Sequence, residues 1–329
     1  MTAAAAALRE GGPTALLLGG IGVRVRALEL AGRIAAKTGC RVIAEFGNPR
    51  TERGAGRVVA NRVPYAVDSA VAMLKDLRRI VMAGSKPPVS FFAYPGKPSL
   101  LSPPSCTFTR LAGVEQDIEG ALEALAEELG ALALAPAHVA KLAPPAIPEG
   151  KITLEGIAAV LGALIPEDAI VVDEAVSSGR GFAALTTNSQ PHDWISSMGG
   201  SIGYGMPFSI GAAIASPGRK VIALVGDGSA MYTLQALWTM ARESLDVTIV
   251  VFANRAYRIL RGELAAVGAG TPGKRATDML TLDRPNLDWR SLARGHGVEA
   301  GQAADLGGFA RELERGLASL GPYLIELLL

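Results

Sequence analysis

The chain has 329 residues, of which 49% are hydrophobic and 19% are charged, and its formal net charge is +1. This length allows two domains of roughly 100–200 residues each, and the apolar content excludes a disordered chain. Because the net charge is close to zero, we expect neither nucleic acid nor a membrane surface to be a partner.

The cysteines, the N-terminal segment and the apolar runs indicate in which cellular compartment the protein is expected. Cys40 and Cys106 form no CxxC pair, which is typical of buried thiols in a reducing environment. The alanine-rich segment Met1–Gly12 lacks the basic start and apolar run of a signal peptide. The longest apolar runs, such as Val247–Ala253, have the length of a strand and are too short to span a bilayer. We therefore expect a cytoplasmic protein.

The first half begins with a strand, a glycine turn, a helix and a second strand. These elements are predicted at Thr14–Leu18, Gly19–Gly22, Val23–Thr38 and Arg41–Glu45. Such a unit is typical of a parallel, doubly wound sheet. The alternation continues with a helix at Asp68–Arg78, a strand at Arg79–Ala83 and a helix at Gly120–Leu134.

A proline-rich segment, Leu142–Gly150, reads LAPPAIPEG and predicts a stiff linker. We place the domain boundary there, with a first domain at 1–142, a linker at 143–150 and a second domain at 151–329. The second domain again alternates between the two types of element. Strands are predicted at Ala169–Val172, Val221–Val225, Val247–Phe252 and Tyr323–Leu328, and helices at Met231–Arg242, Asp288–His296 and Leu306–Leu317. The fold class expected is α/β, with two doubly wound parallel-sheet domains.

The most informative motif is Gly-Asp-Gly-Ser at residues 226–229, directly after an apolar strand. Ligands of open α/β sheets bind beyond the carboxyl ends of strands, and glycines let backbone amides approach a phosphate. A helix that follows would add the positive end of its dipole. Asp227 and Asn254, at the ends of consecutive strands, are oxygen ligands of the kind that Mg²⁺ prefers. The pattern predicts a site for magnesium and a phosphate group.

This motif, Gly-Asp-Gly-Ser followed by a helix, a strand and an asparagine, resembles the cofactor motif of thiamin-diphosphate enzymes. Gly199–Ala215 is similar to the family's glycine-rich segment, and Val171–Gly179 to its segment facing the diphosphate. The first half, with its LLLGGIG and FFAYPGKPS stretches, resembles the family's middle domain. Acetolactate-synthase-like and benzoylformate-decarboxylase-like proteins show the greatest similarity.

The resemblance implies roles for individual residues. Asp227, the Asn254 side chain and the backbone carbonyl of Ala256 would be the magnesium ligands. Residues that would contact the cofactor are Ser177, Ser178, Gly200, Ile202, Gly226, Gly228 and Ser229. Among them, the Gly200 carbonyl would accept a hydrogen bond from the aminopyrimidine, and Ile202 would be the apolar wedge under the cofactor. Ile259 and Leu260 would line the substrate pocket, and the apolar Leu260 favours a hydrophobic pocket.

Three features leave alternatives open. His192 is either an acid–base group or a solvated loop residue. The spacing of Arg255, Arg258 and Arg261 fits contact with a substrate carboxylate or, more simply, a solvated helix face. The turn Gly19–Gly22 could bind FAD or ADP, as middle domains of some relatives do, or serve helix–sheet packing. Its motif is an incomplete G-x-G-x-x-G, which favours packing.

The resemblance implies an enzyme that uses thiamin diphosphate and Mg²⁺ to decarboxylate or carboligate a 2-oxo acid, as a homo-oligomer. The family's pyrimidine-binding domain supplies an activating glutamate, and we expect that domain to lie outside this chain, on a separate domain or subunit. Alternatively, the chain is an inactive fragment or a cofactor-binding or assembly subunit. A generic nucleotide-binding protein is a weaker alternative, because it does not explain the position of Asn254.

Overall fold

The computed structural model describes residues 1–329, which form two compact units, Met1–Lys141 and Leu142–Leu329. Residues 142–150 contain neither helix nor strand. None of the helices combines the length and the apolar content that crossing a membrane requires.

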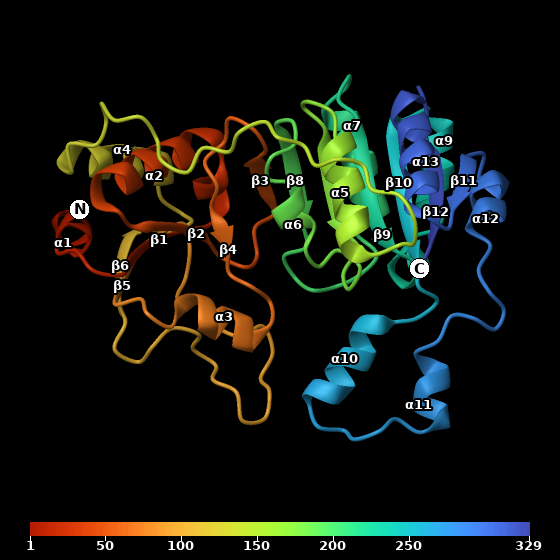
Figure 1. Cartoon of the computed structure of the whole chain (residues 1–329), viewed down its shortest axis with the longest axis horizontal. Helices are drawn as coiled ribbons and strands as arrows, with labels where there is room; N and C mark the ends of the chain where they lie inside the picture. Colours follow the sequence, from red (N-terminus) through yellow and green to blue (C-terminus); the bar gives the residue numbers. More distant parts are fainter. The chain divides into compact units, whose positions relative to one another are not determined.

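The first unit contains one parallel sheet, in which neighbouring strands follow the order β4-β2-β1-β5-β6 (Figure 1). Its strands are β1 (Thr14–Leu18), β2 (Arg41–Ala44), β4 (Asn61–Arg62), β5 (Arg79–Ala83) and β6 (Thr107–Ala112); a short strand, β3 (Arg50–Arg53), lies outside this sheet. Every residue of β1 is buried, because both faces of this central strand are covered.

Helices cover both faces of this sheet. In Figure 1, α2 and α4 lie on the opposite side of the sheet from α3. Two apolar clusters correspond to these faces, one formed with α1, α2 and α4 and the other with α3. The helices are α1 (Thr2–Arg9), α2 (Val25–Thr38), α3 (Val67–Leu74) and α4 (Ile118–Glu128), and a 3₁₀ turn spans Gly20–Val23.

Helix α4 differs from the sequence expectation at both ends. It begins after Asp117, whose side chain accepts a hydrogen bond from the Gly120 N–H at 2.9 Å. It ends at Glu128, before Gly130, whose φ of 65° is left-handed and stops the helix short of the expected Leu134.

The second unit contains a second parallel sheet, whose strands follow the order β11-β12-β10-β9-β7-β8. They are β7 (Ile170–Glu174), β8 (His192–Ser196), β9 (Val221–Gly226), β10 (Val247–Ala253), β11 (Glu299–Ala303) and β12 (Tyr323–Leu328). β8 lies on one side of β7, and β9 and β10 lie on the other. The strand order therefore reverses beside β7, and ligands of such sheets bind at that switch point.

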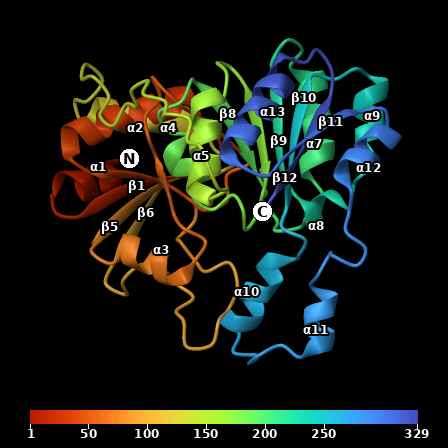
Figure 2. The same cartoon turned by 45° about the vertical axis from the view of Figure 1, so that its right-hand side comes forward.

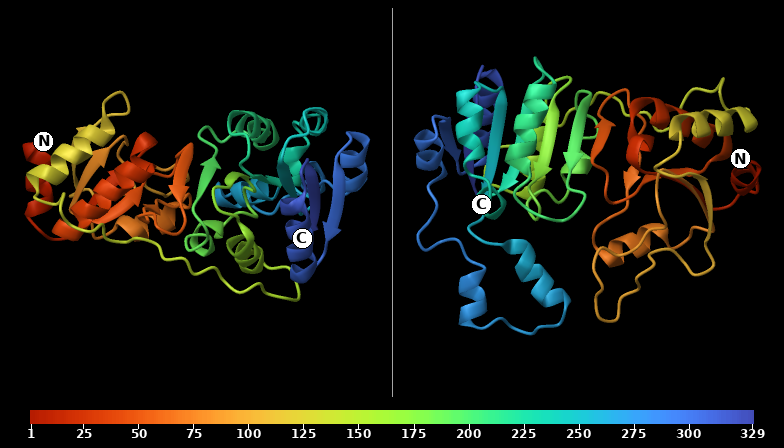
Figure 3. Two further views of the ribbon diagram at one scale, coloured as in Figure 1. Left: turned by 90° about the horizontal axis from the view of Figure 1, so that it is seen from above. Right: turned by 180° about the vertical axis from the view of Figure 1, so that it is seen from behind.

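Helices also cover both faces of the second sheet (Figure 2). One apolar cluster includes residues of α5 (Leu154–Leu164), α6 (Phe182–Leu185) and α13 (Leu306–Ala318); the other includes residues of α7 (Gly205–Ala215), α9 (Ala236–Arg242) and α12 (Trp289–Gly295). Two further helices, α10 (Arg258–Ala266) and α11 (Lys274–Met279), contain no buried residue and project beyond this sheet (Figure 3).

The expected continuous helix at Met231–Arg242 is wrong. A single turn, α8 (Asp227–Ala230), is followed by hydrogen-bonded turns, and α9 begins only at Ala236. The Thr233 hydroxyl donates to the carbonyl of Gly203 at 2.9 Å, which ties this connection to a distant loop. This tertiary contact accompanies the break in a segment of good helical propensity.

The expected fold class, α/β with two doubly wound parallel sheets, is confirmed.

Candidate cofactor site

Strands β9 and β10 bring the Gly-Asp-Gly-Ser motif and Asn254 to one edge of the second sheet. They are parallel neighbours, and Phe252 is paired with Gly226. Asp227 directly follows this pair on one strand, and Asn254 follows it two residues later on the other. The carboxyl ends of parallel strands meet at the same edge, so both polar side chains start from adjacent points.

Asp227 is only 2% exposed and is held by two backbone N–H groups. One carboxylate oxygen accepts from Gly228 at 2.8 Å, and the other accepts from Arg255 at 2.6 Å. Burial raises the pKa of Asp227 to about 6, and the two N–H donors and the Arg255 charge offset only part of the lost solvation. Because burial disfavours the charged form of Asp227, a further positive group nearby would be needed to keep this carboxylate ionised.

Asn254 and Ala256 follow the end of β10, the strand paired with the one that precedes Asp227. The Asn254 side-chain oxygen accepts from the Ala256 N–H at 2.9 Å, which fixes the direction of the amide. The carboxylate oxygens of Asp227 and the amide oxygen of Asn254 each retain a second lone pair after these bonds. No group of three or more His, Cys, Asp or Glu could hold a metal, so a site here depends on amide and carbonyl oxygens. Such donors suit Mg²⁺.

The glycine turn after β9 is tightly packed. A Cβ added to Gly228 would lie 2.7 Å from the ring of Tyr257, so only glycine fits without moving the ring. Ser229 is buried, with 5% of its surface exposed. Its hydroxyl lies close to the Gly226 backbone, because it would be 3.7 Å from a Cβ atom added to that glycine. The turn therefore presents backbone and one hydroxyl at the sheet edge, which is what a phosphate group requires.

The loop after β7 adds a buried hydroxyl at the neighbouring strand end. Ser178 is 1% exposed, and its side-chain oxygen has no hydrogen-bond partner. A buried hydroxyl without a partner is costly, so it favours a ligand group at this place. Ser177 is half-buried beside it. Val176, just before, has a φ of 50°, which is rare for a β-branched residue and is typical of functional loops.

A third loop, residues 197–205, reaches the same edge through Glu174. The carboxylate of this buried residue accepts from the N–H groups of Gly203, Tyr204 (3.2 Å) and Gly205 (2.8 Å). Burial raises the pKa of Glu174, and the N–H donors oppose the rise. The loop that carries Gly200, with φ 72°, and the half-buried Ile202 is thus fixed to the end of β7.

The sequence did not indicate Glu174 as a residue of the site. Its position at the end of β7 was the only available signal. The same contact also corrects the expectation of a helix dipole aimed at a phosphate. α8 is a single turn, and the amino end of the longer helix α7 is already occupied by the Glu174 carboxylate. A phosphate would therefore depend on turn N–H groups and hydroxyls more than on a dipole.

His192 lies at the opposite edge of the sheet from Asp227. It is the first residue of β8, and Asp193 next to it is paired with Ile170, the first residue of β7. A strand of five or six residues spans roughly 16–20 Å. His192 is also 4% exposed, not a solvated loop residue, and its Nδ1 lies 2.7 Å from the Gln190 carbonyl oxygen. The interpretation of His192 as a solvated loop residue is therefore wrong, while an acid–base role for it stays a prediction.

Ile259 and Leu260 lie in the first turn of α10, which follows Tyr257 and the metal-ligand segment. Leu260 is 46% exposed and Ile259 is half-buried. The expected helix face of Arg255, Arg258 and Arg261 is wrong, because α10 begins at Arg258 and Arg255 lies before it with a φ of 55°.

In the first unit, the glycine turn after β1 serves close packing. A Cβ on Gly19 would lie 2.3 Å from both the Glu45 carboxylate and the Gly84 carbonyl oxygen. The position is filled by protein atoms, which favours packing over FAD or another nucleotide at this point.

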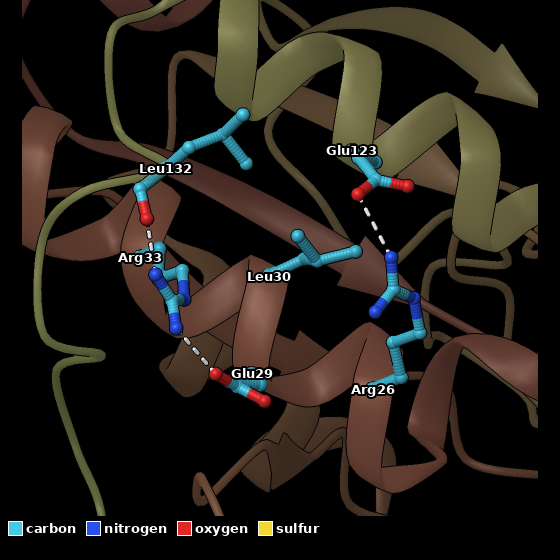
Figure 4. Close-up of a pocket in the computed structure, with 6 residues that line it drawn as sticks. All are labelled: Arg26, Glu29, Leu30, Arg33, Glu123 and Leu132. Atoms are coloured by element: carbon cyan, nitrogen blue, oxygen red, sulfur yellow. Dashed lines mark hydrogen bonds and ion pairs between the residues drawn. The ribbon is translucent and has the colours of Figure 1, made fainter.

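A surface pocket of about 200 Å³ lies between α2 and α4 of this unit (Figure 4). Its charged side chains pair with one another, Arg26 with Glu123 at 2.8 Å and Arg33 with Glu29 at 2.5 Å. Because these charges are paired, the pocket offers no free charge for a phosphate.

Comparison with known proteins agrees with this geometry. Residues 176–327 match the family described as "Thiamine pyrophosphate enzyme, C-terminal TPP binding domain"; thiamine pyrophosphate is another name for thiamin diphosphate. Over 98% of its length, the chain is 44% identical to "Putative acetolactate synthase large subunit IlvX" of Mycobacterium tuberculosis, and it spans 62% of that protein. It is 37% identical to benzoylformate decarboxylase of Pseudomonas aeruginosa over 64% of the chain and 39% of that enzyme.

Solved structures show the same fold. A thiamine diphosphate-dependent 4-hydroxybenzoylformate decarboxylase of Rhodococcus jostii superposes with a TM-score of 0.81, at 24% identity, over 99% of this chain and 63% of that one. Benzoylformate decarboxylase of Polynucleobacter necessarius superposes with a TM-score of 0.74 at 18% identity, over the same shares. The second unit of this chain thus matches the family of C-terminal thiamine-pyrophosphate binding domains. The chain is similar to acetolactate-synthase-like and benzoylformate-decarboxylase-like proteins, and it spans less than two thirds of the length of these relatives.

Proposed function

We propose that the carboxyl edge of the second sheet binds Mg²⁺ and thiamin diphosphate and that the protein decarboxylates or carboligates a 2-oxo acid. The observation that supports this best is the convergence of Asp227, Asn254 and the unpartnered, buried Ser178 hydroxyl at adjacent strand ends. Oxygen donors for a hard cation and a hydroxyl for a phosphate are what this cofactor would need. The related 2-oxo-acid enzymes support the same assignment.

In this proposal the metal is held by Asp227, the Asn254 side chain and the Ala256 carbonyl. The diphosphate would be contacted by Gly226, Gly228, Ser229, Ser177 and Ser178. Gly200 would accept from the aminopyrimidine, and Ile202 would be the wedge beneath it. Glu174 acts through the loop that carries Gly200 and Ile202, and is a positioning residue. When bound, the cofactor supplies a thiazolium that stabilises the carbanion left by decarboxylation.

We propose that the activating glutamate comes from a pyrimidine-binding domain outside the two units, on another polypeptide or elsewhere in the protein. The 329 residues alone should then bind the cofactor but release little carbon dioxide from benzoylformate or pyruvate. Binding measured by calorimetry, with Mg²⁺ and with EDTA, tests the site. Release of carbon dioxide tests the need for the second domain. Rapid turnover by the isolated chain would contradict this proposal. Cofactor binding with no turnover, even with a pyrimidine-binding domain supplied, would favour an assembly or cofactor-binding subunit.

Exposed apolar side chains on α7 and α9 support a further proposal, that the protein is a homo-oligomer. Phe208, Ile214 and Trp238 are 47%, 60% and 52% exposed. Exposed apolar groups of this size on neighbouring helices are typical of protein–protein interfaces. The free, buried thiols of Cys40 and Cys106 fit the proposed cytoplasmic location.

The Leu260→Glu variant tests the proposed substrate pocket. A carboxylate at this position should repel an anionic oxo acid and disfavour an apolar ring. With a pyrimidine-binding domain supplied, we expect the ratio of kcat/KM for benzoylformate over pyruvate to fall by about tenfold, or roughly 1.4 kcal/mol. Leu320→Glu, at a 93% exposed leucine near the C-terminus, is the control. An unchanged ratio in Leu260→Glu would remove this residue from the pocket.

A further inference from the structure

A short segment, residues 280–282, returns to the proposed metal site after α10 and α11, and we call it the return segment. Ala256 forms an isolated antiparallel bridge with its middle residue, Thr281. The two hydrogen bonds of this bridge run from the Leu282 N–H to the Arg255 carbonyl at 2.7 Å and from the Tyr257 N–H to the Leu280 carbonyl at 3.0 Å. These bonds lie on either side of Ala256 and Thr281, which therefore form a non-hydrogen-bonded pair.

This pairing sets the direction of the Ala256 carbonyl. In a non-hydrogen-bonded pair, the N–H and the carbonyl of each residue point away from the opposite segment. On that side, the Ala256 N–H donates to the Asn254 side-chain oxygen at 2.9 Å. Ala256 is buried, and no N–H or O–H group of the chain donates to its carbonyl. A buried carbonyl without a donor favours a ligand on the same side as the Asn254 amide.

The hydrogen bonds that tie the return segment to the second sheet are those two bonds beside Ala256. Helices α10 and α11, which precede the return segment, contain no buried residue and cannot anchor it by core packing. The Thr281 hydroxyl bonds to Arg261 and Thr277, which belong to these helices. The Leu282 side chain reaches the glycine turn, because it would lie 3.5 Å from a Cβ atom added to Gly228. The return segment is thus attached where the metal and the diphosphate would bind.

We propose that the return segment positions the Ala256 carbonyl for the metal. The inference rests on the proposed function of the same site. The Ala256 carbonyl and the Tyr257 N–H belong to one planar peptide, so the bond from this N–H to the return segment orients the carbonyl. The Leu282 N–H holds the preceding peptide through the Arg255 carbonyl. The metal should in turn stabilise both bonds, because a ligand shifts a protein toward the conformation that binds it best.

Amide hydrogen exchange of the full chain tests this link without an activity assay. The Tyr257 and Leu282 N–H groups should exchange at least about tenfold more slowly with saturating Mg²⁺ and thiamin diphosphate than in EDTA. The Asp168 N–H, which donates to the Pro191 carbonyl at 2.8 Å before β7 begins, is the control. It lies at the opposite edge of the same sheet, and its exchange should change by less than about twofold.

The Leu282→Pro variant removes one of the two N–H groups of the bridge. Its affinity for Mn²⁺, measured by electron paramagnetic resonance with inorganic pyrophosphate present, should fall by about 10–100-fold, as for other groups that orient a metal ligand. Leu282→Ala keeps the N–H and shortens the side chain, so its affinity should stay within about threefold of wild type. Thermal unfolding in EDTA shows whether each variant is folded, and the exchange experiment decides if Leu282→Pro is not.

The outcomes separate this inference from the proposed function. If the wild-type chain binds Mg²⁺ and thiamin diphosphate but the Tyr257 and Leu282 N–H groups exchange as in EDTA, the positioning role is wrong and the site remains. Wild-type Mn²⁺ affinity in a folded Leu282→Pro chain would also overturn it, as would an equal loss in Leu282→Ala. If the wild-type chain binds neither the cofactor with Mg²⁺ nor pyrophosphate with Mn²⁺, the proposed function fails, and the inference fails with it.

Discussion

The Asp227→Ala variant should lose Mg²⁺-dependent binding of thiamin diphosphate. The substitution removes the only carboxylate of the proposed ligand set and leaves an amide and a carbonyl oxygen. Replacing outer-shell partners of metal ligands already costs about 10–100-fold in metal affinity, so loss of a charged ligand should cost more than about 100-fold. It also leaves the N–H groups of Gly228 and Arg255 without their acceptor. Titration calorimetry with saturating Mg²⁺ measures the change.

Two further variants make the result specific. Asp227→Asn keeps a polar side chain of the same shape and should also lose the metal-dependent affinity, although the fold is preserved. Asp246→Ala removes an aspartate just before β10, at the opposite edge of the same sheet, where it pairs with Lys220. This control should bind the cofactor as the wild-type chain does. Unchanged cofactor affinity in Asp227→Ala would refute the metal assignment.

The contribution of Asp227 to the stability of the metal-free chain should decrease as pH rises from about 4 to 7. Burial raises the folded-state pKa of Asp227 from its ordinary value of 3.8 to about 6, so the folded state holds this proton more tightly than the unfolded state. The stabilisation from the neutral carboxyl is complete below pH 3.8 and is lost as pH passes through 6. A shift of this size corresponds to at most about 3 kcal/mol. Bound Mg²⁺ should reverse the loss.

Urea unfolding in EDTA at pH 4.5 and pH 7.5 isolates this contribution when Asp227→Asn is compared with the wild-type chain. The neutral asparagine cannot lose a proton, so the variant should gain free energy of unfolding relative to wild type by about 1–3 kcal/mol on going from pH 4.5 to pH 7.5. Other titrating groups affect both proteins alike and cancel. A difference between the two proteins that is the same at both pH values would contradict the assigned pKa.

Much of the fold was predictable because its signals are local. The strands expected at Val221–Val225 and Val247–Phe252 appear as Val221–Gly226 and Val247–Ala253. Both are uninterrupted apolar runs, which is typical of strands that are buried on both faces. The Gly-Asp-Gly-Ser motif also lies where a parallel sheet must place it. Alternating strands and helices allow few other arrangements.

The features that the sequence did not reveal depend on contacts between distant segments. The contact of Glu174 with Gly203–Gly205 joins residues about 30 positions apart, so no local sequence pattern predicts it. The break between α8 and α9 accompanies the bond from Thr233 to Gly203. The position of His192 was hidden for the same reason, because only the register of β8 against β7 shows at which end of the sheet it lies.

Arg255 illustrates a different limit. The spacing of Arg255, Arg258 and Arg261 is helical, and periodicity alone predicts a solvated face. The left-handed φ of Arg255 follows from the turn that joins β10 to α10, which is fixed by its bonds to Asp227 and Leu282. A pattern of spacing contains no information about such a turn.

A crystal structure of the chain grown with Mg²⁺ and thiamin diphosphate tests the assignment of the cofactor site most directly. We predict one metal ion bound by Asp227, the Asn254 side-chain oxygen and the Ala256 carbonyl at about 2.0–2.1 Å. The diphosphate should lie against Gly228–Ser229 and the Ser178 hydroxyl. A cofactor bound instead at the Gly19–Gly22 turn or in the pocket between α2 and α4, with no metal at Asp227, would contradict the account.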